Sequence, residues 1–179
     1  MYKLSKNQLN GLLLNATRDN NILTVRRLLQ SGAYVNALDY NGNTALMIAA
    51  SQSNIDNKCM ELLLKKGADI NMQNAQNETA LMKCVDCDNK AGVDMLLYNN
   101  ADPNKCDRNG NTAFLRAIEL SRLHIAEVLS SFIPDLSYKN HFDEDALMLA
   151  YQSKNIKVIL FVLKLKELKE EKGEFIRKK

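Results

Sequence analysis

Apolar side chains recur along this chain at the spacing of one helix face, in short segments separated by polar turns. The first two segments place them at Leu9, Leu12, Leu13 and Ala16, and then at Ile22, Val25, Leu28 and Leu29. Side chains three or four residues apart lie on one side of a helix, so the pattern predicts two short helices with a polar break at residues 19–21. The second helix should end at Gly32, because glycine adopts the positive φ of a helix exit without a Cβ penalty.

The same pattern returns with a fixed period. The segment D-Y-N-G-N-T-A at 39–45 reappears as D-R-N-G-N-T-A at 107–113, and the Thr44 position recurs at Thr79, Thr112 and Asp145, at steps of 35, 33 and 33 residues. A second landmark keeps this step, at Gly32-Ala33, Gly67-Ala68-Asp69, Asn100-Ala101-Asp102 and Pro134-Asp135. Because one unit of this size cannot bury its own apolar face, the period predicts a stack of helix–turn–helix units.

The repeated segments resemble the ankyrin-repeat family. The matching stretches are T-A-L-M-I-A-A at 44–50, T-A-L-M at 79–82, T-A-F-L at 112–115 and D-A-L-M at 145–148, and the resemblance covers roughly residues 9–165. It implies an all-α ankyrin-repeat solenoid of stacked helix-turn-helix units with short hairpin-like finger loops. The family's Pro and His are replaced here by Ala and by Met or Leu, so thioether packing should replace a polar link, and we expect Met47, Met82 and Met148 in the core.

The repeat spacing divides the chain into one ankyrin-repeat domain, residues 1–172, and a charged tail, residues 173–179. The expected repeats are an N-terminal cap at 1–38, units at 39–73, 74–106 and 107–139, and a closing unit at 140–172. Ser5 or Asn7 should cap the first helix and Thr44 the third, since a side-chain oxygen can accept from an orphan N–H. The last helix should run from Ile156 to about Lys172 and then fray.

The third repeat departs most from the pattern. Asn77 and Asn100 stand where the second repeat has glycines, and Asn is the best non-glycine residue for the left-handed region. Gly92 falls inside a predicted helix, where it costs about 1 kcal/mol against alanine. We therefore expect this repeat to be locally weak. In the fourth repeat, Pro134 should force Ile133 into extended geometry.

Charge and cysteine usage narrow the class of partner. Of 179 residues 46% are hydrophobic, and the net charge of +3 equals the balance of seven Lys/Arg and four Glu in residues 164–179, so the body has no global field for nucleic acid or an anionic membrane. No apolar run is long enough to span a bilayer, and the N-terminus lacks the features of a signal peptide. Four cysteines without a paired framework indicate reduced thiols. We expect a cytoplasmic location, or delivery into a host cell without a cleavable signal.

The chain offers no catalytic constellation. Cys84-x-x-Cys87 lacks the further ligands of a structural zinc site, which favours core or loop thiols. His124 should be a solvated residue of an outer helix, and no nucleophile elbow or phosphate loop is present. Asn36, Asn71 and Asn104 should hold the hairpin backbone, although in the ankyrin family such residues can be hydroxylated. We expect a protein that is not an enzyme and that uses no cofactor and no metal; a regulatory subunit of an enzyme complex is the alternative.

The predicted function is protein binding through a concave surface of fingers and inner helices. The second, third and fifth finger positions should point away from the core, and the resemblance implies contacts there and on the first helix of each repeat. The expected partner-binding residues are Arg18, Tyr40, Asn41, Asn43, Ser51, Gln52, Gln76, Glu78, Asp86, Arg108, Asn109, Asn111, Glu119, His141, Phe142 and Glu144. Phe142 could instead tuck under the following helix. A microbial adaptor or effector acting inside a host cell is an alternative function.

The last predicted helix is apolar on more than one face. Leu160 and Leu165 belong to a run in which nearly every residue from 156 to 165 is apolar. A closing repeat needs a polar outer side for solubility. The excess apolar surface therefore predicts a covering partner, with self-association of the chain as one possibility.

Overall fold

The computed structural model describes residues 4–52, 56–132 and 136–177, with side chains described as far as residue 168. Ten helices fall within these ranges. Their bounds are α1 Lys6–Arg18, α2 Ile22–Gln30, α3 Ala45–Ala50, α4 Lys58–Lys65, α5 Ala80–Asp86, α6 Lys90–Tyr98, α7 Ala113–Glu119, α8 Leu123–Ser130, α9 Ala146–Ser153 and α10 Ile156–Arg177. This order of short helix pairs confirms the expected all-α ankyrin solenoid.

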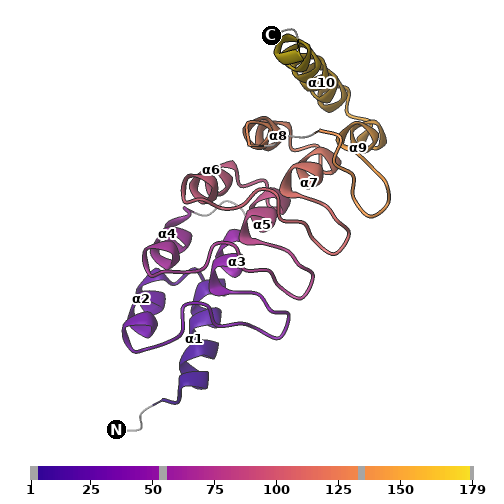
Figure 1. The fold of residues 1–179 in the computed structure, drawn as a ribbon. Helices are drawn as coiled ribbons and strands as arrows, with labels where there is room; N and C mark the ends of the chain where they lie inside the picture. Colours follow the sequence, from indigo (N-terminus) through magenta and orange to yellow (C-terminus); the bar gives the residue numbers. More distant parts are fainter. Residues whose placement is uncertain (1–3, 53–55, 133–135, 178–179) are drawn as a thin grey trace.

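The helices form two stacked rows with finger loops projecting from one side (Figure 1). In the inner row α1, α3, α5, α7 and α9 pack successively against one another, and the outer helices α2, α4, α6 and α8 each pack on the inner helix of their own repeat. The two chain ends lie at opposite ends of the stack. Among the described helices, none has the length and apolar composition needed to cross a bilayer.

The helix starts are fixed by side-chain caps. Ser5 forms a capping box with Gln8, so Ser5 rather than Asn7 is the first cap. The hydroxyl of Thr44 accepts from the Met47 N–H at 3.2 Å, and the equivalent residues Thr79, Thr112 and Asp145 accept from the residue three positions on. Each bond satisfies one orphan donor of a helix start. The expected capping role of Thr44 is confirmed.

Asparagine replaces glycine at the special backbone positions of the third repeat. Asn77 has φ of 59° where Gly42 has 76°, and Asn100 has φ of 64° where Gly67 has 80°. The predicted left-handed conformation is confirmed, and the Cβ at each asparagine carries the strain that glycine avoids. The prediction for Ile133 concerns a residue that lies outside the described ranges.

Gly92 has a packing role that helix propensity does not reveal. A Cβ built on it would lie 2.7 Å from the Sγ of Cys84 and 2.7 Å from Nδ2 of Asn89. Both distances are below any ordinary van der Waals contact. The glycine therefore makes room for the fully buried Cys84 thiol, so alanine at this position would collide rather than stabilise.

The core prediction is wrong at Met148. Met47 and Met82 are each 1% exposed, as expected, but Met148 is 46% exposed. The first two lie on α3 and α5, which have inner helices on both sides, whereas α9 packs against α7 alone among the inner helices described. The same amino acid at the same repeat position is therefore buried or open according to its neighbours.

The last helix is longer than the sequence indicated. α10 continues through Gly173 to Arg177, beyond the end expected near Lys172. Val158 and Val162 are buried against the stack, while Ile156 and Leu160 are 63% and 58% exposed. Leu165 packs against the core instead of facing outward. The exposed apolar surface of α10 is therefore narrower than the run of apolar residues suggested.

Candidate protein-binding surface

Each finger loop is closed from within by the side chain of its first residue. Oδ1 of Asp39 accepts from the backbone N–H groups of Asn41 and Asn43, both at 2.9 Å. The other fingers repeat this arrangement around Asn74, Asp107 and Asn140. An Asx side chain that binds backbone two residues on is a common device of tight turns. The finger backbones are thus fixed before any partner arrives.

Backbone hydrogen bonds also join each finger to the next. The Ala75 N–H donates to the Asn41 carbonyl at 3.0 Å, and the same bond joins Arg108 to Gln76 and His141 to Asn109. Behind the tips, Oδ1 of Asn36 accepts from the Asp69 N–H and Oδ1 of Asn71 accepts from the Asp102 N–H.

These side-chain bonds confirm the expected structural role of Asn36 and Asn71. The counterpart of Asn104 would involve residue 135, outside the described residues.

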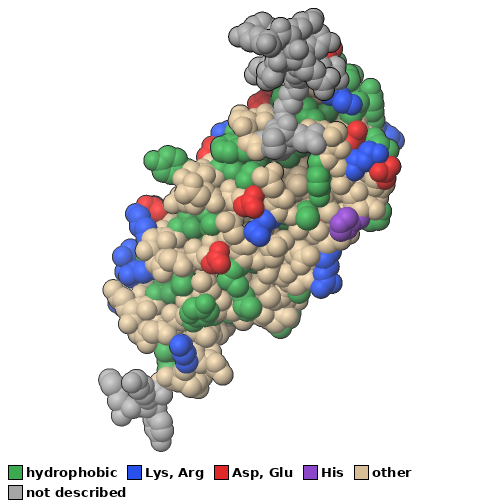
Figure 2. All heavy atoms as spheres, in the orientation of Figure 1, with side chains coloured by type: hydrophobic (Ala, Val, Ile, Leu, Met, Phe, Trp, Pro, Cys, Tyr) green, Lys and Arg blue, Asp and Glu red, His purple; other side chains and the backbone are tan. Residues whose placement is uncertain are grey.

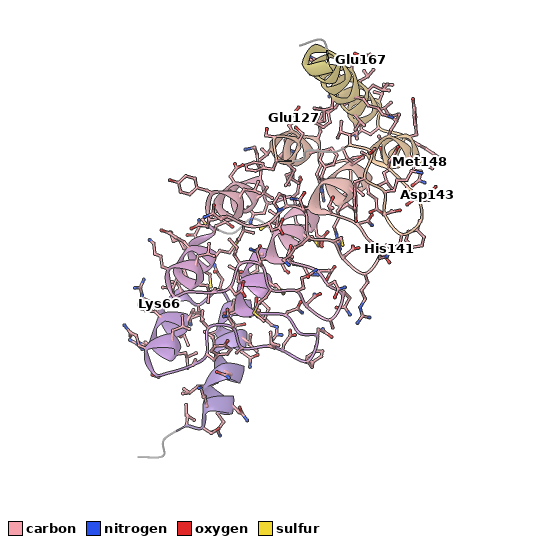
Figure 3. The ribbon with its side chains drawn as sticks, in the orientation of Figure 1. Lys66, Glu127, His141, Asp143, Met148 and Glu167 are labelled. Atoms are coloured by element: carbon pink, nitrogen blue, oxygen red, sulfur yellow. The ribbon has the colours of Figure 1, made fainter. Side chains whose placement is uncertain are left out.

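The outermost finger positions carry exposed side chains, as expected. Tyr40 is 93% exposed and Phe142 is 65% exposed, so Phe142 does not tuck under α9. The other exposed residues at these positions are Asn41, Gln76, Arg108, Asn109 and His141. His141 and Asp143 lie on the last finger, on the side of the stack away from the outer-helix residues Lys66 and Glu127 (Figure 3). The fingers therefore present two aromatic side chains and one guanidinium to solvent.

The expectation that the fifth finger position points away from the core is wrong at Asn111, which is buried, while Asn43, Glu78 and Glu144 are half-buried. Nδ2 of Asn74 donates to Oδ1 of Asn43 at 2.8 Å, and Nδ2 of Asn140 donates to Oδ1 of Asn111 at 3.0 Å, which leaves Asn111 buried. The remaining members, Glu78 and Glu144, accept from the first residue of their own fingers at 2.9 Å. Hydrogen bonds from Asn140 and Gln152 lower the pKa of Glu144. Asn43, Asn111 and Glu78 join neighbouring repeats, whereas Glu144 is bound within its own repeat, so these side chains are only partly available to a partner.

The N-terminal inner helices contribute a second set of links. Nη2 of Arg18 lies 2.8 Å from Oδ2 of Asp39, and Nε2 of Gln52 donates to the carbonyls of Thr17 and Arg18. Ser51 is exposed, with its hydroxyl donating to the Met47 carbonyl. On α7, Glu119 is exposed and has no ion pair among the described residues. Arg18, Ser51 and Glu119 therefore face the concave side as expected.

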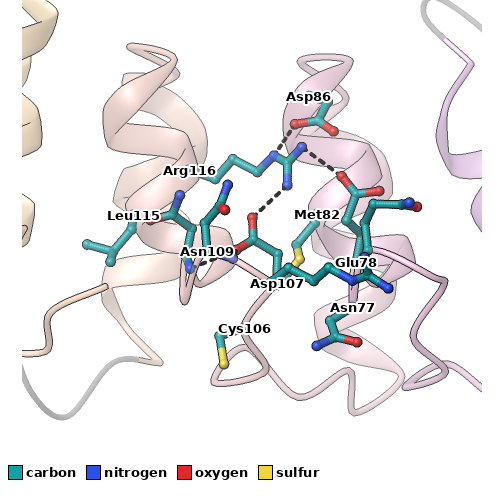
Figure 4. A network of polar contacts seen from close by, with 12 residues as sticks. Asn77, Glu78, Met82, Asp86, Cys106, Asp107, Asn109, Leu115 and Arg116 are labelled. Carbon is teal, nitrogen blue, oxygen red and sulfur yellow. Dashed lines mark hydrogen bonds and ion pairs between the residues drawn. The ribbon is translucent and has the colours of Figure 1, made fainter. Parts of the chain in front are cut away.

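Arg116 is the centre of an ionic network between the third and fourth repeats (Figure 4). Its Nε lies 2.5 Å from Oδ1 of Asp86, Nη2 lies 2.9 Å from Oε1 of Glu78 and Nη1 lies 3.2 Å from Oδ2 of Asp107. Lys83 forms a further ion pair with Glu78. The sequence analysis did not predict a role for Arg116. The equivalent residues of the preceding repeats are Ile48 and Lys83, and this change from an apolar to a cationic side chain could have pointed to it.

The network shifts the pKa values of two of its carboxylates, Glu78 and Asp86, in opposite directions. Burial alone would raise the pKa of Glu78, but hydrogen bonds from Lys83 and Asn74 and the charges of Lys83 and Arg116 lower it. Burial raises the pKa of Asp86, and the attraction of Arg116 only partly offsets this. Asp86 is therefore the less well compensated of the two carboxylates.

Two grooves lie between the fingers and the inner helices. The first groove, of about 380 Å³, is lined by Arg18, Asp39, Tyr40, Asn41, Asn43, Ile48, Ser51, Gln52 and Lys83. The second groove, of about 440 Å³, is lined by Gln76, Glu78, Asp86, Asp107, Arg108, Asn109, Asn111, Arg116, Glu119 and Leu120. The structure thus brings thirteen of the sixteen expected residues into two adjoining grooves, and leaves His141, Phe142 and Glu144 on the last finger.

A third groove lies on the opposite, outer-helix surface. It has a volume of about 420 Å³ and is lined mainly by cationic side chains from α2 and α4, together with Ile22, Glu61 and Leu62; the cations are Arg26, Lys58, Lys65 and Lys66. Figure 2 shows Lys and Arg side chains along this edge. Lys65 pairs with Glu61 at 2.5 Å and Lys58 pairs with Asp56, so part of this charge is already countered by exposed ion pairs.

The thiols lie at packing positions. Cys84 is fully buried, and burial raises the pKa of its thiol, while Cys87 is half-buried with its Sγ 3.0 Å from the Ser51 carbonyl. His124 is exposed, with Nε2 3.4 Å from Oδ1 of Asp88. Within the described residues, no three His, Cys, Asp or Glu side chains come together in a group that could hold a metal ion.

The comparisons with known proteins agree with this geometry. The family model for ankyrin repeats, in three copies, matches residues 12–107. Ankyrin repeat protein R664 of Acanthamoeba polyphaga mimivirus is 30% identical over 146 residues, which cover 80% of this chain and 88% of that protein. The chain belongs to the ankyrin-repeat family, whose members are generally non-enzymatic protein–protein interaction modules.

Two further relatives show how widely the resemblance extends. Ankyrin repeat protein FPV031 of fowlpox virus is 31% identical over 147 residues, and the match covers 80% of this chain but 42% of that protein. The human mitochondrial disaggregase is 45% identical over 71 residues, which cover 40% of this chain and 10% of that protein. The match to the disaggregase is thus confined to a short stretch of a much longer chain.

Proposed function

We propose that this chain is a non-catalytic binding module that holds a partner protein on its fingers and in the first and second grooves. The observation that carries the proposal is Tyr40, 93% exposed on a turn whose backbone is fixed by Asp39 and by the next finger. A large side chain displayed on a preformed turn binds without the entropy cost of ordering a loop. The module acts without metal or cofactor, and its partner is a protein and not nucleic acid or a membrane.

The largest contributions to binding should come from Tyr40, Arg108 and Phe142. Tyrosine, arginine and large aromatic residues dominate interface energetics because they bury much area with few rotamers. All three are exposed on different fingers, and none packs in the core. The removal of these side chains should therefore weaken binding without a matching loss of stability.

The proposal is tested by replacing Tyr40, Arg108 and Phe142 together by alanine. A photoreactive amino acid at position 40 would first capture the partner, which is then purified for titration calorimetry. The triple variant should lose more than about 2 kcal/mol of binding free energy, with a melting curve close to that of the unaltered protein. Tyr98→Ala is the matched control, since Tyr98 is 90% exposed on α6 of the outer row. A partner that binds the triple variant normally would place its site elsewhere.

A second candidate function is that of a microbial adaptor that acts inside a host cell. It is supported by two relatives, R664 and FPV031, that are proteins of viruses replicating in other organisms' cells. A reducing, cytoplasmic location goes with this proposal, since the four cysteines are free thiols. Fractionation of host cells that express the tagged chain tests it: recovery in a membrane or secreted fraction would count against it.

Self-association through α10 remains a separate proposal. Ile156 and Leu160 are exposed one helical turn apart and form a short apolar stripe. Replacing both by lysine should leave the fold intact, because neither belongs to the core. Light scattering that finds a monomer for the unaltered protein at high concentration would contradict the proposal.

A further inference from the structure

The first and second grooves carry opposite net charge. The lining of the first groove includes Arg18, Lys83 and Asp39, a net charge of +1. The lining of the second groove includes four carboxylates, from Glu78, Asp86, Asp107 and Glu119, and two guanidinium groups, from Arg108 and Arg116, a net charge of −2. The concave surface is therefore polarised along the stack.

Most charged side chains of the second groove already form ion pairs with one another. A ligand would therefore interact mainly with the carboxylates that remain unpaired or only partly paired. Arg116 binds Glu78, Asp86 and Asp107, and Lys83 adds a second ion pair to Glu78. Asp86 is bound through Oδ1 alone, which leaves Oδ2 without a hydrogen bond in the described part of the chain, and burial raises the pKa of this group. Glu119 has no ion pair among the described residues. Asp86 and Glu119 hold the same repeat position on α5 and α7, so they face the groove from consecutive helices.

The second groove also offers an apolar wall beside these carboxylates. Leu120 follows Glu119 directly, lines the same groove and is 41% exposed. Lysine and arginine bury their methylene stems on apolar surface while the charged head stays polar. A basic side chain of a partner would thus find both a surface for its stem and two incompletely paired carboxylates for its head.

The first groove favours an acidic side chain of the partner. Arg18 is its most exposed cation, with a side chain that is 43% exposed, and Asp39, its ion-pair partner, is nearly buried at 7%. A guanidinium carries five N–H donors in a planar fork, so the bonds to Asp39 and Asn15 do not exhaust it. A carboxylate of a partner can therefore join Arg18 without displacing Asp39.

We propose that the concave surface takes an extended peptide segment, with a Lys or Arg side chain between Asp86 and Glu119 and an Asp or Glu side chain at Arg18. This inference rests on the proposed function and specifies the chemistry of its partner. Helices pack about 8–10 Å apart, so the centres of charge are separated by about 20–25 Å along the inner row. An extended chain covers that span in about six to eight residues, which fixes the spacing of the two charges.

The test uses phage-displayed random dodecapeptides selected on the whole chain. The enriched peptides should carry one basic and one acidic residue about six to eight positions apart. A fluorescein-labelled copy of an enriched peptide, titrated by anisotropy, should bind Glu119→Lys about tenfold or more weakly and Arg18→Gln several-fold more weakly. Glu127→Lys on α8 is the matched control and should change affinity less than about twofold, because the exposed Glu127 lies on the outer row.

A charge-reversed peptide sharpens the result. With its basic residue replaced by glutamate, the peptide should regain affinity on Glu119→Lys, and higher ionic strength should weaken the original complex. If enriched peptides are lost on the Tyr40/Arg108/Phe142 triple variant but bind Glu119→Lys and Arg18→Gln normally, the charge assignment is overturned and the proposed function stands. If they bind the triple variant normally, both fail. A selection that enriches no peptide with paired charges also overturns the assignment.

Discussion

The second and third repeats share one fold but solve its packing with different residues. The inner and outer helices of the second repeat carry Ala49 and Cys59, and the equivalent residues of the third are Cys84 and Gly92. The cysteine is thus on the outer helix in the second repeat and on the inner helix in the third, where the equivalent outer-helix residue is glycine. The 2.7 Å gap between a built Gly92 Cβ and the Cys84 sulfur shows that the two changes depend on each other.

The fingers of the two repeats differ in the same paired way. The second repeat closes its finger with Asp39 and Asn43, whereas the third uses Asn74 and Glu78. Each pair joins one carboxylate to one amide, and in the third repeat the Asn74 amide also donates to Asn43 of its neighbour. Glu78 carries a negative charge that Asn43 lacks, and Arg116 of the fourth repeat forms an ion pair with it. A substitution in one repeat is thus compensated in the next.

The largest effect is expected when the compensating cation of the third repeat is removed. Arg116→Met leaves Glu78, Asp86 and Asp107 close together without their shared counter-ion, and should lower the free energy of unfolding by about 3 kcal/mol. Urea denaturation measures this loss. Arg122→Met is the control: its pair with Asp88 is more than one-third exposed on both sides, so less than about 1 kcal/mol is expected. Equal losses of unfolding free energy in the two variants would mean that the Arg116 network stabilises the fold no more than an exposed ion pair does.

The loss in Arg116→Met should depend on pH. The lowered pKa of Glu78 stabilises the fold above the pKa of the unfolded carboxyl, and this contribution disappears as pH falls through the folded value. The raised pKa of Asp86 has the opposite sign, so protonation in acid favours the folded state. Because the Arg116 charge lowers the pKa of both carboxyls, its removal lets both take up protons at higher pH, and the deficit of the variant is therefore larger near neutral pH than at about pH 4. A deficit that grows on acidification would contradict the electrostatic explanation.

A smaller loss of stability is expected when Gly92 is replaced by a residue that does not fit against Cys84. Gly92→Ala should destabilise the chain by about 1–3 kcal/mol, because the new methyl group collides with the Cys84 thiol. Adding Cys84→Ala recreates a small residue on the inner helix and should recover part of that loss in thermal melts. Gly11→Ala in α1, where nothing lies within 4 Å of the new methyl group, is the matched control and should stabilise by up to about 1 kcal/mol.

The smallest change in stability is expected from substitutions at the residues that follow the outer helices. Asn100→Gly should stabilise by a few tenths to about 1 kcal/mol, because φ of 64° strains a residue with a Cβ. Gly67→Asn in the second repeat is the reverse exchange at φ of 80°, with no neighbour within 4 Å of its Cβ, and should destabilise by a similar amount. Opposite signs in calorimetry would support the assignment of both exits. Destabilisation by Asn100→Gly would contradict it.

The sequence by itself determined the solenoid, the residues that cap the inner helices, and which residues form the finger loops. These features follow from local rules: apolar periodicity sets the helix faces, Thr44 and its equivalents start inner helices, and Asn77 and Asn100 adopt the left-handed region in place of glycine. Tyr40 could be assigned to an exposed tip because the turn geometry lies within a few residues of it, whereas the sequence left open whether Phe142 is exposed or tucks under the following helix, and the structure shows it exposed.

Only the tertiary structure decided what depends on the neighbouring repeat. Met148 has the same local sequence context as Met82 but is exposed, because burial depends on a second inner helix. Asn111 turns inward because Asn140, 29 residues away, supplies its donor, and Arg116 acquires its role from carboxylates of two repeats. Polar satisfaction and close packing are properties of side chains brought together by stacking, so no rule applied one residue at a time could assign them.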